Sequence, residues 1–126
     1  MSTVVLSAND ELFSASRGYC MIYATIKLTV SPEKRKEVLQ TFKAILGRIR
    51  HEKGCISCNC YVDVESENII FFIEEWMTRD DLGTHLRSVH FSVLIGAMKL
   101  LNKEPDIRFN TIASTAGAEE IKTVRV

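Results

Sequence analysis

The spacing of apolar residues changes along the chain from every second position to every third or fourth, and each change predicts a new element. Apolar and polar residues alternate over residues 20–30, which predicts a half-buried strand. A helix should begin at Ser31 and Pro32, since serine caps a helix and proline fits its first position. Gly54 should end this helix, because glycine adopts the left-handed backbone conformation without strain. The apolar stripe of the helix consists of Val38, Leu39, Phe42, Ile45, Leu46 and Ile49.

The second half of the chain shows the same change between strand and helix patterns. A polar turn at residues 65–68 separates two apolar runs, which predicts a β-hairpin. Thr78 is the expected N-cap of the next helix, and Pro105 interrupts the helical pattern that follows it. The elements expected after Gly54 are strands at 55–64 and 69–76, helices at 79–88 and 90–101, and a strand at 107–113.

This order, β-α-β-β-α-β, is the split arrangement of a ferredoxin-like domain, an α+β fold with helices on one face of a four-stranded antiparallel sheet. We assign the domain to residues 19–113, between an N-terminal arm at 1–18 and a C-terminal extension at 114–126. Residues 121–126 alternate again and predict a further strand, at a sheet edge or on a neighbouring subunit. Helices on one side leave the other sheet face without cover, so we expect a homodimer.

Composition and charge narrow the class of protein. At 46% hydrophobic, 126 residues suffice for one domain with its own core. The 16 basic and 16 acidic residues leave no net charge and no basic stripe, which argues against nucleic acid as a partner. No apolar run approaches the roughly 20 residues that cross a bilayer, so we expect no membrane association. The first residues, MSTVVLSANDELF, lack the positive region and apolar core of a secretory signal, and we expect a cytoplasmic location.

Three of the four cysteines, Cys55, Cys58 and Cys60, are clustered and raise the question of a metal site. A CxxC pair can supply two thiolates to zinc, but a structural site needs about four ligands, and no second CxxC or HxxxH pair follows. We therefore expect no metal, and we interpret these residues, with Cys20, as reduced thiols of a cytosolic protein. In a regular strand, Cys58 and Cys60 share one face and Cys55 points to the other.

Candidate chemistry is concentrated at the predicted strand-to-helix turn within residues 69–91. Trp76, the only tryptophan, shares a strand face with Phe72 and Glu74 and could form an aromatic wall for a flat substrate. His85 lies beside the apolar stripe of the next helix, so its ring should lean toward the sheet, where it could act as an acid or a base. A core tryptophan and a buried histidine paired with a carboxylate or a backbone carbonyl are the structural alternatives.

Other polar residues could reach the same region. Glu74 or Glu75 should be buried at the end of the apolar strand and paired with a histidine or an arginine. His90 is, by the simpler interpretation, a helix cap or a structural contact beside Phe91. Asn59 and Tyr61 share the strand face opposite that of Cys58 and Cys60. This face could border the same cavity or a dimer interface.

Two stretches of the chain resemble a known family. HEKGCISCNCYVD is similar to a turn of glutamate, proline or lysine, glycine and cysteine that leads into the family's second strand. EEW, followed at a fixed distance by HLRSVHF, is similar to the family's third strand and second helix. The family is that of the antibiotic biosynthesis monooxygenases, with relatives among the cofactor-free quinol monooxygenases. The resemblance covers residues 21–113 and leaves both termini unmatched.

The resemblance implies a dimeric α/β barrel, in which two ferredoxin-like protomers pack sheet against sheet and each keeps a pocket between its sheet and its helices. It also implies that a small quinol-type aromatic is oxidised by molecular oxygen without metal, haem, flavin or other cofactor, because an ionised dihydroxy-aromatic can itself reduce oxygen. By the same resemblance, His85 and Trp76 are the expected catalytic residues. The expected substrate-binding residues are Phe72, Glu74, Asn59, Tyr61, His90 and Phe91.

Three other functions stay open. Haem-degrading relatives hold haem with a first-strand asparagine and a second-helix histidine, and Ile26 stands where that asparagine would fall, which argues against haem. Similar small domains isomerise phosphorylated hydroxyketones, and His85 would then move protons. In a non-catalytic dimer the pocket would be packing only. The apolarity of the pocket and the exposure of His85 distinguish this last alternative from the enzymes.

Overall fold

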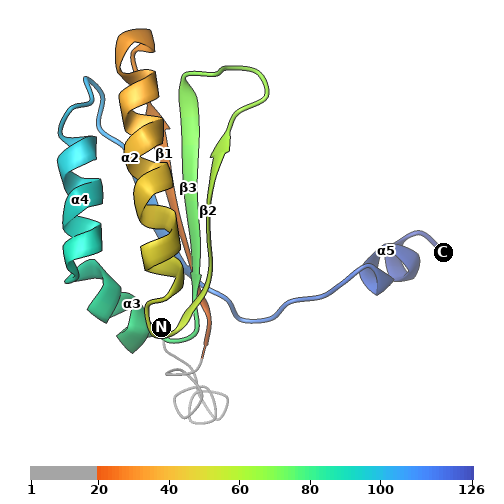
Figure 1. Cartoon of the computed structure of the whole chain (residues 1–126). Helices are drawn as coiled ribbons and strands as arrows, with labels where there is room; N and C mark the ends of the chain where they lie inside the picture. The colour runs from red at the N-terminus through yellow and green to blue at the C-terminus, as the bar shows by residue number, and fades with distance from the viewer. Residues whose placement is uncertain (1–19) are drawn as a thin grey trace.

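Helices cover one face of a four-stranded antiparallel sheet (Figure 1), and the computed structural model describes residues 20–126 of the chain. The elements of these residues are, in chain order, β1 (Ile22–Thr29), α2 (Pro32–Arg50), β2 (Cys55–Val62), β3 (Ile69–Trp76), α3 (Arg79–Leu86), α4 (Val89–Met98), β4 (Asp106–Thr111) and α5 (Glu119–Val124). The strand order β2-β3-β1-β4, with each neighbouring pair antiparallel, confirms the predicted ferredoxin-like α+β fold. The arm expected at residues 1–18 lies outside the described residues.

The helices begin where short polar residues or proline predict. Pro32 occupies the first turn of α2, as expected. The hydroxyl of Thr78 accepts a 3.1 Å hydrogen bond from the backbone amide of Asp81, and the hydroxyl of Ser88 accepts one of 3.2 Å from the amide of Phe91. A cap of this kind is worth about 1 kcal/mol. The two caps define the starts of α3 and α4 and so help to place the histidines that these helices carry.

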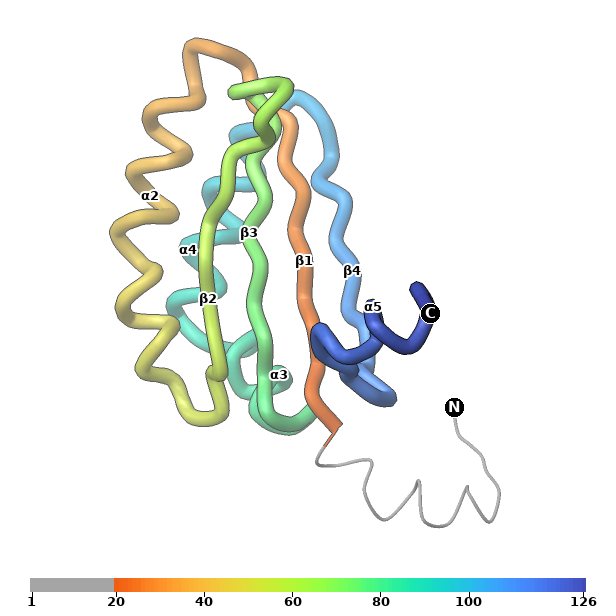
Figure 2. The backbone as a smooth tube through the Cα atoms, turned by 90° about the vertical axis from the view of Figure 1, so that its right-hand side faces the viewer, coloured from red at the N-terminus to blue at the C-terminus, as the bar shows by residue number. Residues whose placement is uncertain are grey.

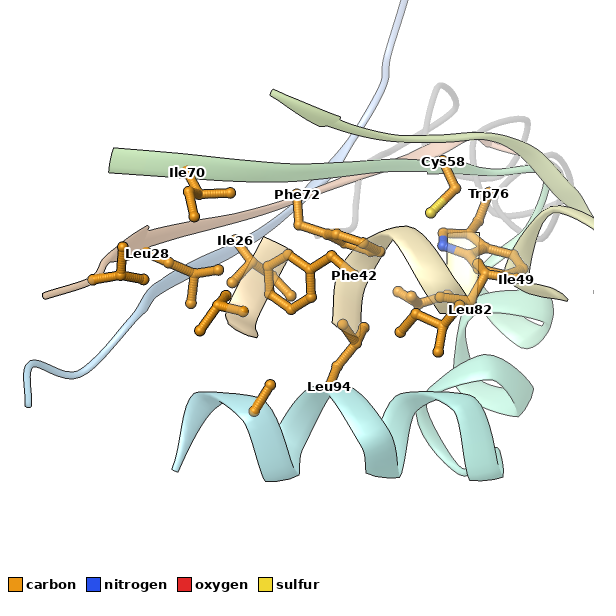
Figure 3. Packing of buried hydrophobic residues seen from close by; sticks show 14 of the residues in the cluster. Ile26, Leu28, Phe42, Ile49, Cys58, Ile70, Phe72, Trp76, Leu82 and Leu94 are labelled. Atoms are coloured by element: carbon orange, nitrogen blue, oxygen red, sulfur yellow. The ribbon is translucent and has the colours of Figure 1, made fainter. Parts of the chain in front are cut away.

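Alternate residues of the strands point toward the helices and form the core (Figure 3). In β1, every second residue from Ile22 to Leu28 is buried, including Ile26, as the alternation predicts. Phe72 of β3 packs edge to face against Phe42 of α2, with ring centroids 5.1 Å apart. Figure 2 shows the other face of the sheet, which α2, α3 and α4 leave uncovered.

An irregularity at the start of β2 overturns one expectation about the cysteines. Gly54 has a φ of 81°, and a β-bulge follows it between Cys55 and Ser57. Because the bulge inserts one residue, Cys55 lies opposite Trp76 while Cys58 lies opposite Glu74, and both point toward the helices. The expectation that Cys55 faces away from Cys58 was therefore wrong. None of Cys55, Cys58 and Cys60 forms a disulfide, and residues 20–126 contain no group of three or more His, Cys, Asp or Glu side chains that could hold a metal ion.

The C-terminal extension contains a short helix instead of the expected strand. Glu119–Val124 form α5, with Glu119 and Glu120 in the first turn, where the helix dipole favours negative charge. The alternation over residues 121–126 therefore led to a wrong prediction. Figures 1 and 2 show the extension leaving the end of β4 and carrying α5 on the side of the sheet opposite to α2 and α4. All residues of α5 are exposed. None of the helices within residues 20–126 is long and apolar enough to cross a membrane.

Candidate functional site

The imidazole of His85, on α3, lies between two carboxylates. Its Nδ1 is 2.9 Å from Oε1 of Glu52, in the turn between α2 and β2, and its Nε2 is 2.9 Å from Oε2 of Glu74, on β3. The side chain of His85 has no exposed surface, and that of Glu74 is 3% exposed. The prediction of a buried glutamate paired with a histidine or an arginine is thus confirmed, and the partner is the histidine.

Two aromatic rings enclose this imidazole. The indole of Trp76 stacks on His85, with ring centroids 4.5 Å apart and 28° between the planes, and Phe91 meets it edge-on at 5.4 Å. The Nε1 of Trp76 also donates a 2.9 Å hydrogen bond to Oε1 of Glu74. The stacked indole favours a positively charged ring, because the face of an aromatic system attracts cations.

His90, at the start of α4, extends the arrangement to the surface. Its Nδ1 is 2.7 Å from Oε2 of Glu52, so the two oxygens of this carboxylate serve two different histidines. The exposed fraction of the side chains falls from 30% at His90 to 15% at Glu52 and to zero at His85. We call the five residues that connect the surface to the core in this way the carboxylate–histidine cluster: His90, Glu52, His85, Glu74 and Trp76.

Within the cluster, the pKa of His85 is raised above its ordinary value of 6.5. Burial acts against the charged ring and would lower the pKa. The close contact and the negative charge of Glu74 raise the pKa of His85, and those of Glu52 raise it further. These effects together outweigh burial. The Nε2 of His85 and Oε2 of Glu74 lack hydrogen-bond geometry despite their short separation, and neither has another hydrogen-bond partner among residues 20–126. The pairing of these two atoms is therefore mainly an attraction between charges.

The position of Glu52 follows from the turn that ends α2. The amide of Glu52 donates to the carbonyl of Ile49, and the amide of Cys55 donates to the carbonyl of Glu52. Gly54 supplies the positive φ of this turn, and the carboxylate of Asp81 occupies the space where a side chain of residue 54 would lie. Glu52 was not among the expected site residues, although it lies in the HEKGC turn that carries part of the family resemblance and that could have identified it.

The other expected site residues are divided between the two faces of the sheet. Phe72 is fully buried and packs in the core against Phe42, while Phe91 contacts His85. Asn59 and Tyr61 lie opposite Ile73 and Phe71 of β3, on the outer face of the sheet. The structure therefore brings together His85, Trp76, Glu74, His90 and Phe91, and separates Asn59 and Tyr61 from them.

The burial of the two expected catalytic rings limits what they can touch. Neither His85 nor Trp76 has exposed surface in the single chain. By the criterion of exposure set out above, this burial favours the non-catalytic alternative, because neither ring can contact a substrate in the conformation observed.

A cavity of about 330 Å³ that is open to solvent lies elsewhere, between the C-terminal end of α4 and the start of β4. A smaller cavity of about 210 Å³ lies between α2 and β2, beside Cys60. The larger one begins one helical turn after Phe91, because Phe91 and Ile95 are four residues apart on α4. Its walls combine apolar side chains with exposed polar and charged ones: Ile95, Met98, Leu101, Pro105 and Ile107, with Lys99, Asn102, Lys103 and Glu104.

Comparison with known proteins identifies the relatives of this fold. The family model described as antibiotic biosynthesis monooxygenase matches residues 21–96. The chain is 30% identical over 89 residues to the "Uncharacterized protein sll1783" of Synechocystis, covering 70% of this chain and 60% of that protein. It is 27% identical over 85 residues to the "Putative monooxygenase YcnE" of Bacillus subtilis, covering 68% of this chain and 90% of that one. The structure of a conserved protein from Methanosarcina mazei superimposes with a TM-score of 0.70 at 28% identity, over 77% of this chain and 97% of the other.

Proposed function

Because the chain belongs to the antibiotic biosynthesis monooxygenase family, we propose that it is a cofactor-independent monooxygenase that oxidises a small aromatic quinol with molecular oxygen. The observation that carries the proposal is the cavity between α4 and β4. Its volume of about 330 Å³ lies at the lower end of the range of ligand pockets, which suits a single aromatic ring system. The name of the Bacillus subtilis relative points to the same class of reaction.

The proposed reaction needs no external reductant. A hydroquinone and dioxygen give a hydroxyquinone and water: one oxygen atom forms a bond to a ring carbon, and the other leaves as water. The substrate supplies both electron pairs that reduce the oxygen and loses its two phenolic protons and one ring hydrogen, of which one returns as the new hydroxyl. The protein assists such a reaction by favouring the ionised quinol and by excluding water from it.

The lining of the cavity suits these tasks. The two ammonium groups of Lys99 and Lys103 outnumber the one carboxylate of the lining, that of Glu104, and so favour the phenolate over the neutral phenol. The side chains of Ile95, Met98 and Ile107 offer apolar surface to one face of the ring and displace water from that face, while the cavity stays open to solvent on its other side in the single chain. The carboxylate–histidine cluster acts through α4, which carries both His90 and the wall of the cavity, so its members are positioning residues.

The proposal includes a homodimer that buries the outer face of the sheet. This face carries Tyr61, which is 51% exposed, and the partly exposed Phe71 and Ile73. The extension with α5 lies on the same side of the sheet, where a second protomer would be. Asn59 and Tyr61, expected to bind substrate, belong in this account to the subunit interface.

A non-catalytic dimeric domain is the second candidate, and the complete burial of His85 favours it. In that case the carboxylate–histidine cluster would only hold α3 and α4 against the sheet, as buried ion pairs do in many structural contexts. The two candidates make different predictions for oxygen consumption, which can be measured directly.

Oxygen uptake by the chelator-treated, flavin-free chain with a panel of hydroquinones tests the proposal. We expect uptake above the rate of spontaneous oxidation, and at least a tenfold loss in Ile107→Trp, which fills the cavity. Phe109→Trp is the matched control, because Phe109 lies two residues further along the same face of β4 and does not line the cavity. Turnover that requires added metal or flavin, or equal rates in both variants, would contradict the proposal.

A further inference from the structure

We propose that Glu52 is a proton-dependent clamp on α4, and that it thereby positions one wall of the α4–β4 cavity. The inference deepens the proposed function and rests on it only for what the cavity binds. Glu52 is a positioning residue in this account, since its carboxylate contacts two histidines and lies at a distance from the cavity.

A single carboxylate ties three parts of the fold together. Glu52 comes from the turn between α2 and β2, and its Oε1 and Oε2 lie 2.9 Å and 2.7 Å from the rings of His85 on α3 and His90 on α4. The backbone of Glu52 is held at both its amide and its carbonyl, so the carboxylate starts from a well-defined point. The clamp joins the two short helices to the turn through charge-assisted hydrogen bonds, which are stronger than neutral ones.

Beyond its first turn, α4 is attached to the rest of the fold by apolar side chains. Leu94 and Ala97 are its buried residues, while most of its other side chains are at least partly exposed. The N-terminal turn is held by the cap of Ser88, by the contact of Phe91 with His85, and by His90 on Glu52. A change in the clamp therefore acts on the first turn of α4, directly before the turn that lines the cavity.

Proton dependence follows from the two-sided contact of His85. Both of its ring nitrogens face carboxylate oxygens, and a charged imidazole can present an N–H to each. A neutral imidazole has only one N–H, so its other nitrogen would place a lone pair against a carboxylate oxygen. Loss of the proton thus turns one of the two attractive contacts into a repulsive one.

Other charged groups near the cluster do not replace this proton. Burial, and after it the negative charges of Glu74 and Glu52, raises the pKa of Cys55 to about 11. Burial is also the main reason why the pKa of Cys58 is raised. Both thiols therefore stay neutral near pH 7. The guanidinium of Arg50 donates to the carbonyl of Cys58 and to Asn59 on β2. On α3, the carboxylate that lies against Gly54 belongs to Asp81.

Nuclear magnetic resonance of the full chain, without substrate, tests the clamp. We expect Glu52→Gln to lower the pKa of His85 by about one pH unit, a tenfold change in its acid constant, since one of two carboxylates is lost. Glu33→Gln, in the exposed first turn of α2, should leave the His85 titration unchanged. In the wild type, the hydrogen-exchange protection of the Leu94 and Ala97 amides should fall about tenfold between about pH 6.5 and about pH 8.5, because loss of the His85 proton loosens Glu52 and with it the hold of Glu52 on His90 in the first turn of α4.

The outcomes separate the clamp from the proposed function. An unchanged His85 titration in Glu52→Gln, or pH-independent protection of α4 in the wild type, would overturn the clamp, and the wild-type comparison needs no variant that must fold. Binding of 1,4-dimethoxybenzene, which does not ionise, should weaken about tenfold over the same pH range if the cavity is the quinol site. A proton-dependent α4 without binding of this probe would support the clamp and count against the cavity assignment.

Discussion

His85 stacks on Trp76 with ring centroids 4.5 Å apart, and both rings are fully buried. The two residues that the sequence marks as the expected catalytic pair therefore contact each other and not the solvent. The same imidazole faces Glu52 and Glu74, so the stack is part of a charged cluster inside an apolar core. This combination makes the cluster a test case for the energetics of a buried charge.

Removing one partner of the buried pair should be costly. In Glu74→Gln, the charged His85 loses a carboxylate that is almost fully buried, and we expect the free energy of unfolding to fall by about 3 kcal/mol. Glu75→Gln is the control. The carboxylate of Glu75 lies on the outer face of the sheet and accepts a hydrogen bond from the hydroxyl of Ser57, which a glutamine side chain can also accept. The control should lose about 1 kcal/mol or less in urea unfolding. Equal losses of unfolding free energy in both variants would show that the buried charge of Glu74 stabilises the fold no more than the partly exposed charge of Glu75.

Stability should depend on pH with a definite sign. The folded-state pKa of His85 lies above its unfolded value of 6.5, so its contribution is complete below that pH and is lost as pH rises toward the folded pKa. Within this window the free energy of unfolding should fall by about 1.4 kcal/mol per pH unit. The measurements should be made below about pH 8.5. Above their ordinary pKa of 9.0, the partly buried thiols also lower the free energy of unfolding as pH rises, which would add to the effect of His85.

Chemical unfolding at several pH values measures this slope. His85→Gln should remove it, whereas His51→Gln should retain it, since the ring of His51 is exposed and its hydrogen-bond partner within residues 20–126 is the uncharged carbonyl of Gly47. A wild-type stability that rises between about pH 6.5 and about pH 8.5 would contradict the direction given for the pKa.

Two glycines should respond to alanine with opposite signs. Gly54 has a φ of 81° and lies against the carboxylate of Asp81, so Gly54→Ala should lower the free energy of unfolding by more than about 1 kcal/mol. Gly47 is helical and has open space around it, so Gly47→Ala should raise it by about 0.5–1 kcal/mol. Thermal melting of both variants checks the pair. A neutral Gly54→Ala would mean that the turn carrying Glu52 tolerates a side chain.

The C-terminal extension should contribute to dimer formation. Ile121 and Val124 are 61% and 73% exposed, and lie three residues apart on α5, so they form an apolar strip that a second protomer can cover. Replacing both with Asp should raise the dimer dissociation constant at least tenfold, while Lys122→Ala should not. Size-exclusion chromatography with light scattering measures the mass. A wild-type chain that is monomeric at micromolar concentration, or a double variant that dimerises normally, would exclude this role.

Local rules explain what could be predicted from the sequence. The alternation in β1 and the serine–proline start of α2 depend on near neighbours in the chain, and the structure contains both elements within a few residues of the expected bounds. The face shared by Phe72, Glu74 and Trp76 follows from strand parity alone, and all three are buried.

Long-range geometry explains what could not be predicted. Glu52 and His85 are 33 residues apart, and their contact depends on how the α2–β2 turn packs against α3. The bulge after Gly54 moves Cys55 to the face of Cys58, and parity counting has no means of detecting an inserted residue. The alternation of the tail has no sheet to join within the single chain, and helix formation prevails there. The α4–β4 cavity is lined by residues 95–107 alone, but its volume depends on how the chain turns from the helix into the strand, which the spacing of apolar residues does not show.

Oxygen-isotope labelling tests the central claim, cofactor-free monooxygenation of a quinol, most directly. The chelator-treated, flavin-free chain is incubated with a hydroquinone that it consumes under labelled dioxygen, and the products are analysed by mass spectrometry. The account predicts one labelled oxygen atom in the hydroxyquinone, the other in water, and no hydrogen peroxide. An unlabelled quinone formed together with labelled hydrogen peroxide, or labelled product at the same rate without protein, would contradict it.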